Sequence, residues 1–167
     1  MFGTKIGCAG IGCAALGACD EGSITISGGN VTATGGDDGA GIGGASNCAP
    51  KSITITGGVI TANAGNKAAA IGSGYNASSD KIGCGDISIT GGEVTSNGNI
   101  GYGQSYWENC LEGGRIVISG NALVKVANGE ITLKDAVEPG HVTQKYPITV
   151  TVKNPSYING TKRHLIK

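Results

Sequence analysis

The stretch SITISGGNVTATG, residues 23–35, decides the fold because the chain repeats its pattern three more times. The other copies are SITITGGVITANA at 52–64, DISITGGEVTSNG at 86–98 and RIVISGNALVKVA at 115–127. The same place in each copy is held by Ile24, Ile53, Ile87 and Ile116, at steps of 29, 34 and 29 residues. A repeat of this length is typical of a solenoid, in which each copy forms one coil.

Each copy predicts three short strands separated by glycine turns. In the first copy, Ile24 and Ile26 alternate with hydroxyl-bearing residues, which indicates a strand with one buried face. Gly28-Gly29 predicts a turn, and 31–34 predicts a second strand rich in β-branched residues. A third strand is expected at Ala40–Gly43, a motif that recurs around Ile11, Ile71 and Ile100.

Three strands per repeat without a helical period predict an all-β chain folded as a right-handed parallel β-helix of about four coils. Stacked coils bury the apolar faces that a single coil leaves open. The predicted interior ladders are Ile24-Ile53-Ile87-Ile116, Ile26-Ile55-Ile89-Ile118, Val31-Ile60-Val94-Leu123 and Ile11-Ile42-Ile71-Ile100. The alternative is an antiparallel sandwich or barrel with a hairpin at each Gly-Gly pair.

We expect two regions. Residues 1–133 hold the β-helix repeats, and 134–167 form a C-terminal β cap or appendage, or begin a following module. An alternating strand is predicted at 147–153, PITVTVK. A cap is expected because an open solenoid end invites pairing with other chains.

Composition restricts the class of protein. Glycine accounts for 32 of 167 residues without a Gly-X-Y period, which excludes collagen. Residues 1–138 carry 7 Lys/Arg and 12 Asp/Glu, a balance of −5, whereas 139–167 carry 5 Lys/Arg and no acid. Five dispersed charges indicate a solvated tail rather than a nucleic-acid site. No apolar run reaches transmembrane length.

Six cysteines predict a disulfide framework, because five of them fall in the loop that returns to the first strand of the next coil. The expected pairs are Cys19–Cys48 and Cys84–Cys110, each of which would link adjacent coils. Isolated buried thiols are one alternative. A metal site is the other, although the chain has no CxxC pair and both histidines lie in the C-terminal region.

The pattern ITIxGGxVTAxGG…GAGIG at 24–43 resembles the glycine-rich repeats of bacterial cell-surface and secreted β-helix proteins. These include carbohydrate-binding proteins of the pectate-lyase-like superfamily. The resemblance covers roughly residues 5–133 and rests on core and turn residues. It implies an extracellular or bacterial cell-surface module that contacts polysaccharide, such as a plant or host glycan.

Aromatic loop residues predict the binding site. The candidates lie on loops of consecutive coils and combine rings with amides and a carboxylate: Tyr75, Asn76, Tyr106, Trp107, Glu108 and Asn109. A ring can cover the C–H face of a sugar while polar groups bind its hydroxyls. The alternative is that Trp107 folds back and forms the core of its own loop.

Asp37-Asp38 is a weaker candidate, for Ca²⁺. These carboxylates lie in a turn whose counterparts contain asparagine, and calcium prefers oxygen ligands. A ladder of Asx turns explains the same residues. Apart from this ion, no cofactor is expected.

We therefore expect a non-enzymatic surface or secreted module that binds polysaccharide or acts as an adhesin. The alternatives are a fragment of a polysaccharide lyase or hydrolase and a structural stalk repeat, and we identify no catalytic residue. The outward Ser and Thr columns, for example Thr32, Thr61 and Thr95, resemble the arrays of ice-binding solenoids, but such residues are also ordinary on solvated strands.

Overall fold

The computed structural model describes residues 7–13, 22–77, 84–104, 114–134, 141–145 and 148–151. Within these ranges all regular structure is β-strand and there is no helix. Accordingly, none of the described residues belongs to a helix long and apolar enough to span a membrane. The predicted all-β class is confirmed.

The strands form three sheets that the chain visits in turn. The first sheet contains β2 (Ser23–Ile26), β5 (Ser52–Ile55), β8 (Asp86–Ile89) and β11 (Ile116–Ile118). The second contains β3 (Asn30–Thr34), β6 (Val59–Asn63), β9 (Glu93–Asn97), β12 (Leu123–Val126) and β15 (Ile148–Thr151). The third contains β1 (Ile11–Gly12), β4 (Ile42–Gly43), β7 (Ile71–Gly72), β10 (Ile100–Gly101), β13 (Glu130–Lys134) and β14 (His141–Lys145).

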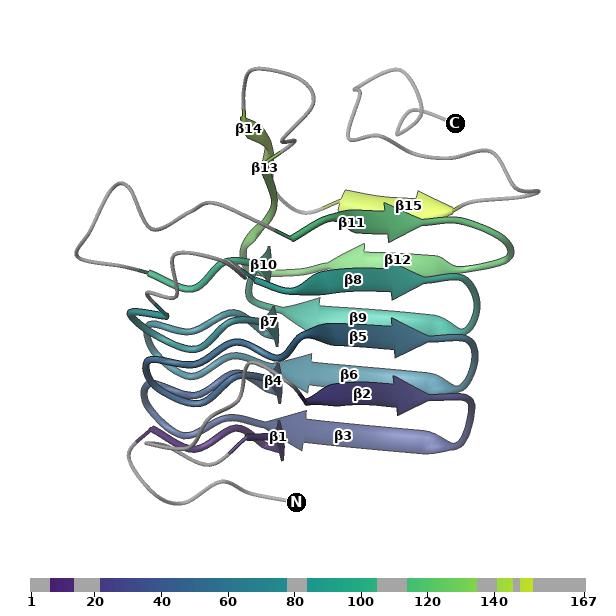
Figure 1. Ribbon diagram of the computed structural model, residues 1–167. Helices are drawn as coiled ribbons and strands as arrows, with labels where there is room; N and C mark the ends of the chain where they lie inside the picture. The colour runs from purple at the N-terminus through teal and green to yellow at the C-terminus, as the bar shows by residue number, and fades with distance from the viewer. Residues whose placement is uncertain are drawn as a thin grey trace.

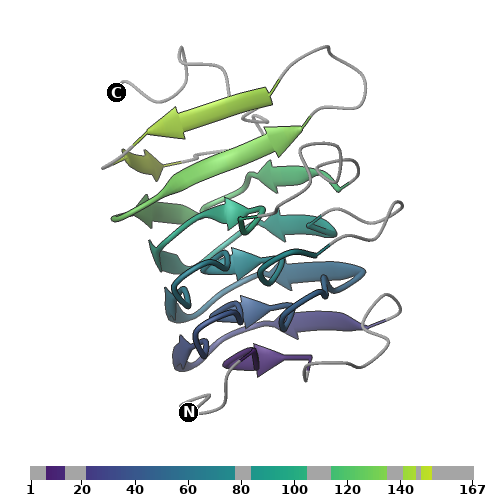
Figure 2. The same ribbon diagram turned by 90° about the vertical axis from the view of Figure 1, so that its left-hand side faces the viewer.

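These sheets form a parallel β-solenoid. In Figure 1 the strands of the first sheet run to the right in front, those of the second return behind them, and the chain climbs from β2 to β11. This winding is right-handed, and three complete turns separate β2 from β11. Figure 2, turned by 90°, shows the coils stacked one above another along a single axis.

The core consists of isoleucine and valine ladders that run along this axis. Ile24, Ile53, Ile87 and Ile116 pair in register, and the Ile26 and Ile11 ladders are confirmed as well. Side chains of the middle coils are sealed from solvent: Ile53 and Ile55 have 0% exposure. Their outward neighbours, such as Thr54, remain partly exposed. Burial of one face of each strand thus selects the register.

One ladder differs from the prediction. Val124, not Leu123, pairs with Val94 and lies fully buried, while Leu123 pairs with Glu93 and is partly exposed. The turn before β12 contains one more residue than the equivalent turns, because six positions separate Ile118 from Val124 whereas five separate Ile89 from Val94. A shift of one residue exchanges the two faces of a strand.

A glycine column allows the third sheet to stack closely. Gly12, Gly43, Gly72 and Gly101 all have positive φ, between 120° and 140°. A Cβ atom on Gly43 would overlap the carbonyl oxygen of Gly72, and one on Gly72 would overlap that of Gly101. The recurring Ile-Gly pair therefore combines a core side chain with a backbone position that only glycine fits.

Pairing changes direction at the C-terminal end of the solenoid. β15 pairs antiparallel with β12, and β14 pairs antiparallel with β13. The strand expected at 147–153 is thus observed at Ile148–Thr151. These strands add a last row to the second and third sheets, which is the placement expected of a cap. The division of the chain at residue 133 remains a prediction.

Candidate functional site

Loops from three coils form one edge of the solenoid, which we call the loop edge and define by Ser46, Asn47, Lys67, Tyr75, Asn76 and Gln104. Main-chain hydrogen bonds place equivalent loop residues one above another. The amide of Asn47 donates to the carbonyl of Tyr75 at 2.8 Å, and that of Asn76 donates to the carbonyl of Gln104 at 2.8 Å. The loop edge therefore repeats at the spacing of the coils.

Asparagine side chains join two rows of this edge. Asn47 and Asn76, 29 residues apart, both have a left-handed backbone, with φ of 61° and 53°. Asparagine tolerates this conformation better than most residues. Nδ2 of Asn76 donates a hydrogen bond of 3.1 Å to Oδ1 of Asn47, and Asn47 is exposed. The two amides thus form a polar ladder that reaches solvent.

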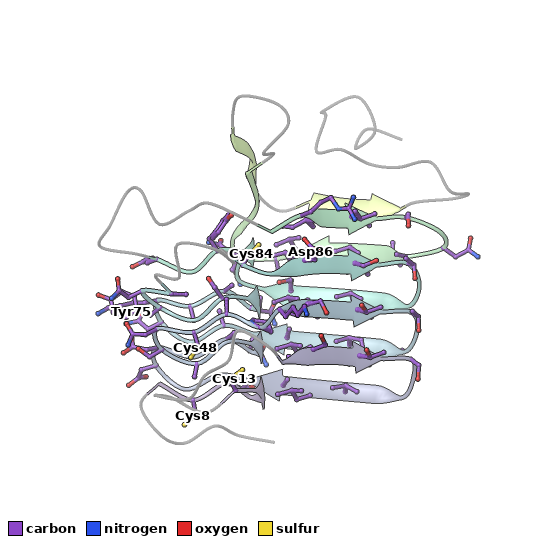
Figure 3. The ribbon with its side chains drawn as sticks, in the orientation of Figure 1. Cys8, Cys13, Cys48, Tyr75, Cys84 and Asp86 are labelled. Carbon is purple, nitrogen blue, oxygen red and sulfur yellow. The ribbon has the colours of Figure 1, made fainter. Side chains whose placement is uncertain are left out.

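Tyr75 supplies the aromatic surface of the loop edge. Figure 3 shows Tyr75 at the outer boundary of the loops, away from the three sheets. The ammonium Nζ of Lys67 lies 4.6 Å from the centroid of the Tyr75 ring, within the range of a cation–π interaction. Both side chains are partly exposed. The loop edge therefore presents a ring, a cation and several amides together.

The turn that contains Asp37 and Asp38 lies directly beside these residues. The amide of Tyr75 donates to the carbonyl of Asp38 at 2.9 Å, and that of Lys67 donates to the carbonyl of Asp37 at 3.3 Å. Within the described ranges, no group of three Asp, Glu, His or Cys side chains gathers to hold a metal. Calcium takes six to eight oxygen ligands, so the ion would need further donors here, and its binding remains a prediction.

Of the six predicted ligand-binding residues, the structure brings Tyr75 and Asn76 together on the loop edge. Tyr106, Trp107, Glu108 and Asn109 lie outside the described residues. The prediction missed Asn47 and the contact of Lys67 with Tyr75. Asn47 could have been found from its place in the repeat, because it precedes Asn76 by one period of 29 residues.

The predicted disulfides Cys19–Cys48 and Cys84–Cys110 are not formed in this structure. Cys48 and Cys84 are present as thiols, and their proposed partners lie outside the described residues. Cys48, 5% exposed, packs with Ala45 and Cys13 in a small separate cluster. Cys84 is 1% exposed and belongs to the main core, so its side chain points inward instead of lining the loop edge.

Burial also sets the chemistry of Cys84. Its Sγ donates a hydrogen bond of 3.3 Å to the carbonyl of Gly85. Loss of solvation raises the pKa of this thiol to about 12, and the nearby carboxylate of Asp86 adds to the rise. Figure 3 shows Asp86 at the start of β8 and Cys84 just before it. A thiol with this pKa is a core side chain rather than a nucleophile.

Comparison with known proteins identifies the repeat. Residues 24–46 and 53–75 each match the family model for a β-helix repeat. Each match begins at an isoleucine of the first ladder and ends on the loop edge, at Ser46 or Tyr75. No curated protein and no solved structure matches the chain. The fold is thus a parallel β-solenoid, and two of its successive coils match a β-helix repeat.

Proposed function

We propose that this chain is a non-enzymatic module, secreted or displayed on a bacterial cell surface, that binds a polysaccharide through the loop edge and in this way serves as an adhesin. The observation that carries the proposal is the arrangement of Tyr75, Lys67 and the Asn47–Asn76 ladder on one boundary of the solenoid. An aromatic ring beside amides suits a sugar, whose C–H face is apolar and whose rim carries hydroxyls.

The chemistry of each residue supports a distinct role. The Tyr75 ring offers a flat apolar surface, and the amides of Asn76 and Gln104 offer both donors and acceptors for hydroxyl groups. Lys67 contributes a positive charge beside the ring, which favours sugars that carry a carboxylate or sulfate. Acidic and neutral plant and host polysaccharides should therefore be screened together.

Trp107 provides a direct measurement, because it is the single tryptophan of the chain. It follows Gln104 by three residues, so a ligand on the loop edge should change its emission. We expect Tyr75→Ala and Trp107→Ala to weaken binding by roughly 2 kcal/mol each, as aromatic residues often do at binding hot spots. Thr54→Ala, on the outward face of β5, is the matched control and should bind normally.

Calorimetry separates the outcomes. If a polysaccharide binds and both aromatic variants keep full affinity, the loop edge is not the site, and the hydroxyl-lined strand faces become the next candidate. If no polysaccharide binds, the proposal fails and a stalk repeat gains support. Release of reducing ends or of an unsaturated uronate from a bound polysaccharide would identify the chain as part of a hydrolase or lyase.

A further inference from the structure

The sequence contains asparagine directly before glycine at three places, which are Asn97-Gly98, Asn128-Gly129 and Asn159-Gly160. The structure describes the first two pairs. In a flexible chain such a pair is prone to lose ammonia from the asparagine side chain. Glycine has no side chain that would keep its backbone nitrogen away from the side-chain amide carbon of the preceding asparagine. The surroundings of each pair therefore decide whether it reacts.

The first pair is held in place by several contacts. Asn97 ends β9, and its Nδ2 donates the hydrogen bond of 2.7 Å to Oδ1 of Asn63. The carbonyl of Asn97 accepts a hydrogen bond of 3.2 Å from the amide of Ala64. Gly98 is buried, and its carbonyl accepts from Oγ of Ser96 at 3.0 Å. The Asn97 side chain cannot turn toward the backbone of Gly98 unless these contacts open.

The second pair has different surroundings, although it lies one coil further in the same part of the repeat. Val126, the last residue of β12, pairs with Ser96, and Asn128 follows in the bend that leads to β13. The Asn128 side chain is exposed, and its amide makes no hydrogen bond within the described ranges. It is therefore free to rotate toward the backbone nitrogen of Gly129.

Stacking of the coils requires the glycine of this second pair. A Cβ atom at Gly129 would overlap the carbonyl carbon of Gly98 and would lie 2.6 Å from the backbone nitrogen of Asn99. A larger residue at this position would push the two coils apart. The same close packing that builds the solenoid thus places a glycine directly after an exposed asparagine.

We propose that Asn128 is a site of spontaneous deamidation in the folded protein and that the fold protects Asn97 from the same reaction. The backbone nitrogen of Gly129 gives its proton to solvent and attacks Cγ of Asn128. A bond forms between this nitrogen and Cγ, the bond from Cγ to Nδ2 breaks, and ammonia leaves. The product is a five-membered succinimide ring.

Water from the solvent then opens the ring at one of its two carbonyl carbons. Opening at the backbone carbonyl gives isoaspartate, and opening at Cγ gives aspartate. Both products carry one negative charge that the amide lacked. Isoaspartate also inserts one carbon into the main chain, at the bend that joins the second sheet to the third.

The test is a time course with the full chain at mildly alkaline pH, well below its melting temperature, followed by tryptic peptide mapping. Trypsin cleaves after Lys125 and Lys134, so the peptide VANGEITLK, residues 126–134, contains Asn128 as its single asparagine. This peptide should acquire the mass of the acid and split chromatographically into aspartyl and isoaspartyl forms. Fragmentation of the peptide 82–115 reports on Asn97. Asn128 should react at least roughly tenfold faster than Asn97, because reaction at Asn97 needs local opening.

Two controls separate the effect of the fold from that of local sequence. The chain unfolded in urea should deamidate at both positions at similar rates. Asn128→Gln should leave the peptide 126–134 unchanged, because the longer side chain forms the ring far more slowly. Equal rates at Asn97 and Asn128 in the folded chain would overturn the proposal, as would an unreacted Asn128. A difference that persists in urea would also overturn it, because the neighbouring residues would then explain the selectivity.

Discussion

Nδ2 of Asn97 donates a hydrogen bond of 2.7 Å to Oδ1 of Asn63, which lies one coil away on the neighbouring strand. Asn63 in turn donates from its own Nδ2 to Oγ1 of Thr34 at 2.9 Å. These residues end β9, β6 and β3, so a continuous chain of side-chain hydrogen bonds crosses three coils. It supplements the backbone ladder at the point where each strand of the second sheet turns toward the third.

We therefore predict that Asn63→Ala destabilises the protein by about 0.5–1.5 kcal/mol for each of its two hydrogen bonds. Thr61→Ala is the control, because Thr61 lies on the same outward side of β6 and pairs with Thr32 and Thr95. It should change the free energy of unfolding by less than about 0.5 kcal/mol. Urea denaturation measures both. An equal, small loss in the two variants would show that the side-chain ladder contributes no stability.

The glycine column gives a second prediction. Gly72→Ala should be strongly destabilising, because φ is +135° and the new Cβ would overlap the carbonyl oxygen of Gly101. Backbone strain alone costs on the order of 1–3 kcal/mol, and the overlap adds to it. Gly28→Ala is the control, since a Cβ there meets no atom within 4 Å. Thermal melting should separate the two variants clearly, and similar melting temperatures would refute the close stacking of the third sheet.

A third prediction concerns the interior ladders. Ile55 is fully buried between Ile26 and Ile89, so Ile55→Ala should cost about 2–5 kcal/mol through lost burial and a cavity. Thr54→Ala, the adjacent outward position, should stay within about 0.5 kcal/mol. Chemical denaturation at neutral pH gives both values. The assigned faces of β5 would be reversed if Thr54→Ala proved the more harmful change.

Much of the fold was predictable because each strand repeats its pattern at a nearly fixed step. The positions of Ile24, Ile53 and Ile87 define a register that local alternation and the repeat length specify independently. The sequence pattern placed Leu123 in the third ladder, where the structure has Val124. The turn before β12 contains one extra residue, which alternation alone does not detect. Insertions in turns are thus the weak point of such a prediction.

The site was less predictable because it depends on loop paths. The contact of Lys67 with Tyr75 joins residues eight positions apart, and no periodic pattern relates them. Cys84 shows the same limit. Alternation from the exposed Asp86 would place Cys84 outward, but β8 begins only at Asp86. Gly85, just before it, has a φ of +73°, so the alternation does not extend back to Cys84, whose side chain is buried.

Burial of Cys84 predicts a pH dependence of stability. The folded chain raises the pKa of this thiol from 9.0 to about 12, mainly because the thiolate would lose its solvation. Below pH 9 the thiol is protonated in both states and has no effect on the unfolding equilibrium. Between pH 9 and pH 12 the unfolded chain releases the proton while the folded chain retains it, so stability falls as the pH rises.

The expected slope is at most about 1.4 kcal/mol of unfolding free energy for each pH unit in this window. Cys84→Ala is the comparison, because it removes the thiol and leaves the other groups that titrate at high pH. The variant should be less stable at pH 7, since it creates a cavity, yet it should lose stability less steeply from pH 8.5 to 10.5. Urea denaturation at several pH values provides both slopes. Parallel curves for the two proteins would mean that the Cys84 thiol ionises as readily in the folded chain as in the unfolded one.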